Sequence, residues 1–263
     1  MTERIDHLLT IDAAVATITL DRPAAYNALT AALLRSLLAT LVELERNAAV
    51  RALVITGTGK GFCAGQALDD IETLKPGAKP DFHAAVVRGF NPVMYKLLTL
   101  EKPIVAAVNG VAAGAGMGLA LACDFRYVAP SASFTTAFSK IGLVPDSGVS
   151  FMLPHMVGYG RALELCMLSE KISAARANEL GLVTKLGANG NVLAEAQVFA
   201  ATLATGPRSL GLIKRQLAHN ALGAFGSALA YEAEMQGVAG ETADFAEGLA
   251  AFVQKRTPLF SGT

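Results

Sequence analysis

Two segments of small residues each follow an apolar run of β-strand character, and both could present backbone N–H groups to a bound oxygen atom. The first is Phe62–Gln66, after the loop 57–61, and the second is Asn109–Gly116, which opens a helix. N–H groups in the first turn of a helix lack partners within it, and small side chains let a ligand oxygen approach. Two such groups aimed at one point would form an oxyanion hole. Taken singly, the glycines of these segments favour tight turns and close packing instead.

Neither segment matches a nucleotide-binding motif. The loop 57–61 lacks the spacing of a Walker loop, and a dinucleotide-binding fingerprint would need a third glycine where Phe62 stands. Gly114–Gly118 fails in the same way, because Leu119 occupies that place. We therefore predict no phosphate-binding loop in either segment.

Other side chains capable of chemistry favour structural roles. Asp124 is typical of a turn or a buried hydrogen bond, and Cys63 is predicted to pack rather than to act as a nucleophile. We assign no catalytic role to the isolated histidines His7, His83, His155 and His219. Three acidic residues are expected on a solvated helix face: Asp69, Asp70 and Glu72.

Composition narrows the class of protein. The 263 residues carry 22 Lys and Arg against 22 Asp and Glu, and this zero net charge argues against nucleic-acid binding, which needs a concentrated positive surface. Three scattered cysteines predict neither a disulfide framework nor a metal site, and they fit a cytoplasmic location. The uncharged stretch 104–123 is rich in Gly and Ala, which predicts a buried strand followed by a helix rather than a membrane span.

Strands and helices are expected to alternate, which is typical of an α/β fold with parallel pairing. The predicted strands are 7–11, 15–20, 52–56, 104–108 and 124–128, and the predicted helices of this part begin after Thr30, at Phe82 (to Leu98) and near Gly114. From about residue 191 the pattern is wholly helical, over 191–204, 208–219, 223–238 and 241–254.

Taken together, these segments resemble the crotonase superfamily of enoyl-CoA hydratases and isomerases. The motifs occur in the family's order along essentially the whole chain: Leu20–Pro23 with Asn27–Leu29, Gly59–Gly65, Val108–Gly116 with Cys123 and Asp124, Ile141–Asp146, and Phe252–Pro258. The resemblance implies a spiral of ββα units over residues 1–195 with the acyl-CoA site. It further implies a C-terminal helical segment over 196–263 that assembles homotrimers, often paired into hexamers.

The resemblance also implies a binding site for acyl-CoA thioesters, with CoA as part of the substrate and no separate cofactor. The two oxyanion-hole N–H groups fall on Gln66 and Ala115. Expected substrate contacts come from the turn Ala24, Ala25 and Tyr26 and from the stretch Ala64, Ala67, Leu68 and Asp69. Lys255 and Arg256 could pair with CoA phosphates of a neighbouring subunit, or lie at a solvated terminus.

Within the crotonase superfamily, hydratases and isomerases differ in the residue that acts as the general base. The two glutamates with which hydratases hold water would fall at Gly118 and Phe138, and neither position carries a carboxylate. Asp146, in Val144–Gly148, resembles the acidic residue of several enoyl-CoA isomerases and of the ring-epoxide isomerase of phenylacetate degradation. An apolar setting near Phe138 would raise the pKa of such an acid. The alternative role for Asp146 is to cap the following helix, since Asp is favoured there.

The sequence therefore predicts an acyl-CoA isomerase that moves a double bond, or rearranges a ring epoxide, through an enolate. An enoyl-CoA hydratase with an unusual water arrangement is the nearest alternative. A non-catalytic acyl-CoA-binding subunit of a larger assembly is the alternative of another class.

Overall fold

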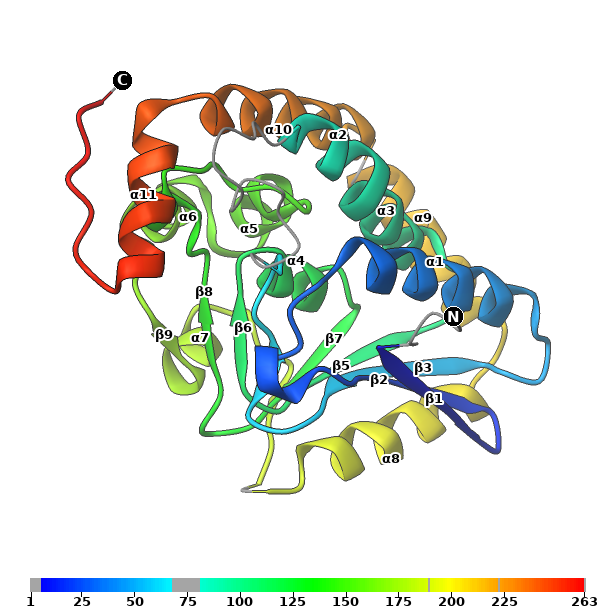
Figure 1. Cartoon of the computed structure of the whole chain (residues 1–263). Helices are drawn as coiled ribbons and strands as arrows, with labels where there is room; N and C mark the ends of the chain where they lie inside the picture. Colours follow the sequence, from blue (N-terminus) through cyan, green and yellow to red (C-terminus); the bar gives the residue numbers. More distant parts are fainter. Residues whose placement is uncertain (1–5, 68–80, 189, 222, 263) are drawn as a thin grey trace, which may run out of the picture.

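The chain folds into two β-sheets surrounded by helices (Figure 1). The structure is a computed structural model that describes residues 6–67, 81–188, 190–221 and 223–262. The larger sheet has the strand order β1-β2-β3-β5-β7-β10, and the smaller sheet has the order β4-β6-β8-β9.

The larger sheet is parallel except for its first hairpin, in which β1 (His7–Asp12) and β2 (Val15–Leu20) run antiparallel. Its central strands β3 (Ala52–Gly57) and β5 (Ile104–Val108) are buried along their whole length, as expected for parallel strands covered on both faces. The strands β7 (Phe125–Val128) and β10 (Lys185–Leu186) complete the sheet. Helix α8 (Val192–Thr205) lies along one face of it (Figure 1).

The smaller sheet collects the second strand of each repeating unit. It contains β4 (Gly61–Cys63), β6 (Val111–Ala113), β8 (Ser133–Thr135) and β9 (Ile172–Ser173). The chain thus passes three times from the larger sheet to the smaller one, in the pairs β3–β4, β5–β6 and β7–β8. This confirms the predicted α/β spiral of ββα units.

The predicted helices begin close to the expected positions, with α1 (Ala31–Arg46) after Thr30 and α4 (Ala115–Leu121) near Gly114. The first part also contains three helices for which no bounds were predicted: α5 (Val149–Val157), α6 (Tyr159–Leu168) and α7 (Ala174–Glu179). The C-terminal helices after α8 are α9 (Ser209–Ala221), α10 (Phe225–Gly240) and α11 (Ala243–Gln254). Thr30 caps α1 as predicted, by accepting a hydrogen bond from the backbone N–H of Leu33.

The helix predicted over 82–98 is a single helical rod with a change of pitch. It consists of α2 (Phe82–Ala85), the π-helical turn η4 (Val86–Phe90) and α3 (Asn91–Thr99). Pro92 lacks an N–H, and its ring would clash with the carbonyl group four residues earlier in a regular α-helix. The wider turn just before it gives that carbonyl group room.

The uncharged stretch 104–123 is divided among β5, β6 and α4, as its composition predicts. Among the described residues, no helix combines the length and the apolar character needed to cross a membrane.

Candidate active site

A cavity of about 230 Å³ lies where the smaller sheet meets the start of α4 and the helix α10. Five of the predicted site residues line it together: Ala64, Gln66, Ala115, Phe138 and Asp146. Gly65 and Gly114 line it beside them. The remaining walls include Leu143, Gln236 and Phe252, so most of the surface is apolar around one carboxyl group.

Strand pairing brings the two predicted oxyanion segments together. In the parallel register of β4 and β6, Cys63 lies opposite Ala112, and Gln66 and Ala115 each follow three residues later. Between them, Gly65 adopts a φ of 90°, a conformation that favours glycine. A Cβ atom on Gly65 would lie 2.7 Å from the carbonyl oxygen of Ala113 and 3.3 Å from the backbone nitrogen of Ala115. The turn at Gly65 therefore rests directly against the beginning of α4.

The backbone N–H groups of Gln66 and Ala115 are left available by the hydrogen bonding around them. The N–H of Ala67 donates to the carbonyl of Leu29, and the N–H of Gly114 donates to the carbonyl of Thr135. Within the part of the chain that the structure describes, no acceptor pairs with the N–H of Gln66 or of Ala115. Two unpartnered donors thus belong to residues of one cavity wall, as an oxyanion hole requires.

Asp146 is buried, with 3% of its surface exposed. Its Oδ1 accepts a hydrogen bond from the hydroxyl of Ser147, and its Oδ2 accepts one from Nε2 of Gln236, each at 2.8 Å. Burial raises the pKa of this carboxyl to about 6, although both hydrogen bonds oppose the rise by favouring the charged form. The capping alternative is wrong, because Gly148 occupies the cap position of α5 and no side chain caps that helix.

A second buried carboxyl group, that of Glu232 on α10, lies behind the Asp146 segment. It accepts hydrogen bonds from the backbone N–H of Gly148, at 2.8 Å, and from the backbone N–H and hydroxyl of Ser150, at 3.1 and 2.6 Å. Burial raises the pKa of Glu232 to about 7, and the nearby charge of Asp146 contributes to the rise. Glu232 thus anchors the start of α5, the helix that follows Asp146.

Sequence reasoning missed Gln236 and Glu232. They lie four residues apart on α10, on the side that also buries Leu229 and Ala233. From that spacing one could predict that both polar side chains lie on a buried face of the helix. The spacing does not predict which loop they contact, because that loop lies about 90 residues earlier in the sequence.

The predicted CoA contacts have three different outcomes. Ala24 and Ala25 lie in the 3₁₀ turn η1 (Pro23–Ala25), and the carbonyl of Tyr26 accepts a hydrogen bond from the N–H of Ala64. This bond places the turn beside the oxyanion segment, outside the cavity lining. Leu68 and Asp69 lie outside the described residues, as do Asp70 and Glu72.

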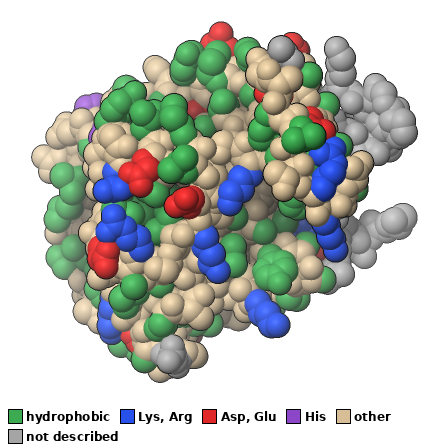
Figure 2. Space-filling model, turned by 90° about the vertical axis from the view of Figure 1, so that its left-hand side faces the viewer, with side chains coloured by type: hydrophobic (Ala, Val, Ile, Leu, Met, Phe, Trp, Pro, Cys, Tyr) green, Lys and Arg blue, Asp and Glu red, His purple; other side chains and the backbone are tan. Residues whose placement is uncertain are grey.

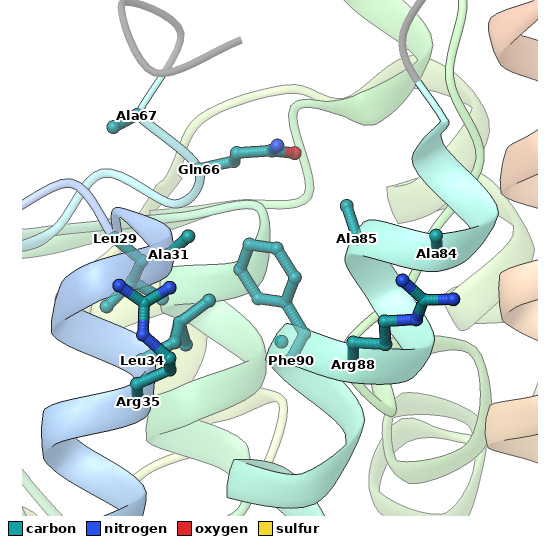
Figure 3. Close-up of a pocket in the computed structure, with 11 residues that line it drawn as sticks. Leu29, Ala31, Leu34, Arg35, Gln66, Ala67, Ala84, Ala85, Arg88 and Phe90 are labelled. Atoms are coloured by element: carbon teal, nitrogen blue, oxygen red, sulfur yellow. The ribbon is translucent and has the colours of Figure 1, made fainter.

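Ala67 lines a second cavity, of about 370 Å³, between α1 and the helical rod α2–η4 (Figure 3). Its floor is apolar, with Leu34 and Phe90, and the guanidinium groups of Arg35 and Arg88 stand at its sides. Gln66 lines both cavities, so they adjoin at the oxyanion segment.

Asp124 and Cys63, which are expected to be structural, and Arg256, which is expected at CoA phosphates or at a solvated terminus, do not line the cavity that contains Asp146. The carboxylate of Asp124 accepts hydrogen bonds from the backbone N–H of Ile104, at 2.8 Å, and from Nζ of Lys214, at 2.9 Å. Cys63 is buried, and burial raises the pKa of its thiol to about 12, which suits packing rather than nucleophilic chemistry. The guanidinium of Arg256 is held by two hydrogen bonds to the carboxylate of Glu247.

Comparison with known proteins decides the family. Residues 10–263 match the sequence profile of enoyl-CoA hydratase/isomerase. The chain belongs to this family. The 1,2-epoxyphenylacetyl-CoA isomerase of Escherichia coli K12 is 40% identical over 253 residues, which cover 96% of this chain and 97% of that protein.

Other relatives are named as enoyl-CoA hydratases rather than isomerases. A probable enoyl-CoA hydratase of Rhodobacter capsulatus is 40% identical over 255 residues, 96% of each chain. The crystal structure of an enoyl-CoA hydratase from Mycobacterium avium subsp. paratuberculosis K-10 matches with a TM-score of 0.88 at 32% identity, covering 97% of this chain and 98% of that one. The protein is thus an enzyme of the crotonase superfamily, and its relatives include an isomerase and hydratases.

Neither of the two positions at which family hydratases are expected to carry glutamates supplies a carboxylate here, and the first has no room for one. A Cβ atom on Gly118 would lie 2.7 Å from the carbonyl oxygen of Ser147 and 2.9 Å from its Cβ. Phe138, the other position, places an aromatic ring in the cavity wall. The close approach of α4 to Ser147 therefore excludes a longer side chain at Gly118 and holds the segment that carries Asp146.

A pair of glycine substitutions tests this close approach. Both Gly118 and Gly160 lie in helices, where alanine is intrinsically more stable by about 1 kcal/mol. A Cβ atom on Gly160 would meet nothing within 4 Å, so Gly160→Ala should be neutral or stabilising. Gly118→Ala should destabilise the fold by about 1–3 kcal/mol, because the new methyl group overpacks the contact with Ser147. Urea unfolding measures both, and equal effects would show that Gly118 has room to spare.

Proposed function

We propose that the protein is an acyl-CoA isomerase that shifts a double bond through a thioester enolate. In this proposal Asp146 is the acid and base, and the backbone N–H groups of Gln66 and Ala115 hold the enolate oxygen. The observation that carries it is the single cavity lined by a buried carboxyl group and by two residues whose N–H groups are unpartnered. No other carboxyl group belongs to the described lining of that cavity.

The reaction follows from this arrangement. Asp146 removes a proton from C2 of a 3-enoyl thioester, and the electron pair of the broken C–H bond moves onto the carbonyl oxygen. Two preorganised N–H donors stabilise that charge, each by about 3–4 kcal/mol in comparable sites. The protonated Asp146 then returns the proton to C4, and the double bond lies between C2 and C3. One carboxyl group suffices, because no water is added.

The surroundings of Asp146 suit both halves of this cycle. A carboxyl group with a pKa of about 6 is largely ionised at neutral pH, yet its proton affinity is high enough to remove a carbon-bound proton. The apolar walls beside it, from Phe138 and Leu143, keep competing water away from the enolate.

The neighbouring cavity supports an elongated substrate. It adjoins the oxyanion segment at Gln66 and combines an apolar floor with two guanidinium groups (Figure 3). In the proposed complex this cavity receives part of the acyl-CoA molecule, and the turn 24–26 contributes to CoA binding beside Ala64.

Two narrower or alternative activities have support from the relatives. The similarity to 1,2-epoxyphenylacetyl-CoA isomerase favours a ring-epoxide thioester as one substrate. The similarity to a probable enoyl-CoA hydratase favours water addition, but the closed position at Gly118 opposes the usual pair of glutamates. Tight acyl-CoA binding without turnover of any of these substrates would instead indicate a non-catalytic binding subunit.

Substitution of the proposed base tests the assignment. Asp146→Asn keeps the size of the side chain but removes its basicity, so conversion of 3-enoyl-CoA to 2-enoyl-CoA should fall by about 10²–10⁴-fold. Absorbance of the conjugated product measures the rate. Asp12→Asn, on the exposed edge of β1, is the matched control and should retain the wild-type rate. An Asp146→Asn variant as fast as the wild type would refute the assignment, and hydration of crotonyl-CoA exceeding isomerisation would favour the hydratase.

The pH dependence of kcat/KM gives a further test. The base must be ionised to act, and burial raises its pKa to about 6, so the rate should be constant above neutrality. Below about pH 6 the rate should fall tenfold for each further pH unit, as Asp146 becomes protonated. A rate that stays level down to pH 4.5 would mean that a carboxyl group with an ordinary pKa, or no carboxyl group, is the base.

We also propose that the chain assembles into a homotrimer or a hexamer. Exposed apolar side chains on α6, α11 and the following tail support this: Tyr159, Met167, Leu168, Phe252, Val253, Leu259 and Phe260. Helix α11 and the tail lie on the left-hand side of Figure 1, and Figure 2 shows that side of the molecule with apolar groups between separate charged ones. Burial of such a patch in an interface would remove it from water. Light scattering should give a mass three or six times the 27.2 kDa of the chain, and a monomer at micromolar concentration would contradict the proposal.

A further inference from the structure

Gln236 bridges the backbone before Asp146 and the carboxyl group of Asp146 itself. Its Oε1 accepts a hydrogen bond of 3.1 Å from the backbone N–H of Val144, and its Nε2 donates a hydrogen bond of 2.8 Å to Oδ2 of Asp146. Only 1% of Gln236 is exposed, and it lines the cavity that Asp146 lines. Within the described chain, no other side chain is hydrogen-bonded to both Val144 and Asp146.

The two bonds fix the direction of the amide. A flipped amide would turn its NH₂ group toward the N–H of Val144, so two donors would face each other and one acceptor would be lost. The NH₂ group of Gln236 must therefore point at Oδ2. With Ser147 donating to Oδ1, each oxygen of Asp146 accepts one fixed hydrogen bond and keeps a further lone pair for the substrate.

Two charged groups lie near Asp146. Glu232 lies one turn before Gln236 on α10, and its negative charge disfavours a second negative charge nearby. Lys140, from the 3₁₀ helix η5 (Phe138–Ile141), lines the cavity and carries the opposite charge. Helix α4 contributes only Ala, Gly, Met and Leu, and the cavity residue of α11 is Phe252. The donors to Asp146 are thus Ser147 and Gln236.

We propose that Gln236 is a positioning residue that aims the carboxyl group of Asp146 into the cavity and sets how readily it takes up a proton. This inference rests on the proposed isomerase function and deepens it. Because Gln236 belongs to α10, it couples the proton-transfer step to the C-terminal helices, whereas the oxyanion donors belong to the first half of the chain.

Two substitutions separate this role from a structural one. Gln236→Leu removes the donor, so the ionised form of Asp146 loses a hydrogen bond and the acidic limb of the kcat/KM profile should move up by about one pH unit or more. In Gln236→Glu the new carboxyl group can still accept the hydrogen bond from the Val144 N–H. Its second oxygen faces Oδ2 of Asp146, and two facing carboxyl groups hold a proton between them. The acidic limb should therefore move to a still higher pH than in Gln236→Leu. At pH 6.5 both variants should lose about threefold or more in kcat, with KM within about twofold, and should recover much of the loss at pH 8.5.

The control is Gln197→Leu on α8, whose amide donates to the hydroxyl of Thr17 far along the larger sheet. It should keep the wild-type profile. A merely structural role for Gln236 predicts a loss that is the same at every pH and that falls on KM and stability as well. A wild-type acidic limb in Gln236→Leu or Gln236→Glu, with urea unfolding confirming the fold, would overturn the inference.

The outcome for Asp146→Asn distinguishes this inference from the function on which it rests. If Asp146→Asn is inactive and Gln236→Leu keeps the wild-type limb, only the role of Gln236 fails. If Asp146→Asn stays active, both proposals fail. If Gln236→Leu does not fold, the near-isosteric Gln236→Glu still tests the limb, because it retains the bond to Val144.

Discussion

The contact between the turn at Gly65 and the start of α4 is the constraint on which the site depends. Parallel pairing of β4 with β6 places the two segments in register, and the backbone conformation of Gly65 lets them touch. The same short helix, α4, meets Ser147 at Gly118 on another side. Helix α4 thus sets the spacing between the N–H groups of Gln66 and Ala115 and the segment that carries Asp146, and a larger side chain at either glycine contact would push these groups apart.

The site is held together against an electrostatic cost. Burial raises the pKa of Asp146 to about 6 and that of Glu232 to about 7, above the values of the same groups in an unfolded chain. The folded state therefore binds these protons more tightly, and it loses stability as the pH rises through 6 and 7. Hydrogen bonds from Ser147, Gln236, Gly148 and Ser150 offset part of this loss. The reactivity of Asp146 and the cost of burying it have the same cause.

Much of this arrangement could be predicted from the sequence, because it depends on local patterns and ordered motifs. Apolar runs gave the central strands, and the small-residue segments indicated free N–H groups, which the family resemblance assigned to Gln66 and Ala115. The convergence of those groups required the β4–β6 register, which no single segment encodes. Two further features could not be predicted from the sequence: the π-helical turn before Pro92 and the hydrogen bond from Gln236 to Asp146. Each depends on how separate parts of the backbone pack.

The proposed oxyanion donors are main-chain groups, whereas the proposed proton-handling groups are side chains on a loop and on α10. A substitution at Gln66 or Ala115 changes the shape of the turn but cannot delete the N–H, unless proline is introduced. A substitution at Asp146 or Gln236 alters which atom receives a proton. In such an architecture, a few exchanges around Asp146 would change the reaction and leave the means of stabilising an anion unchanged.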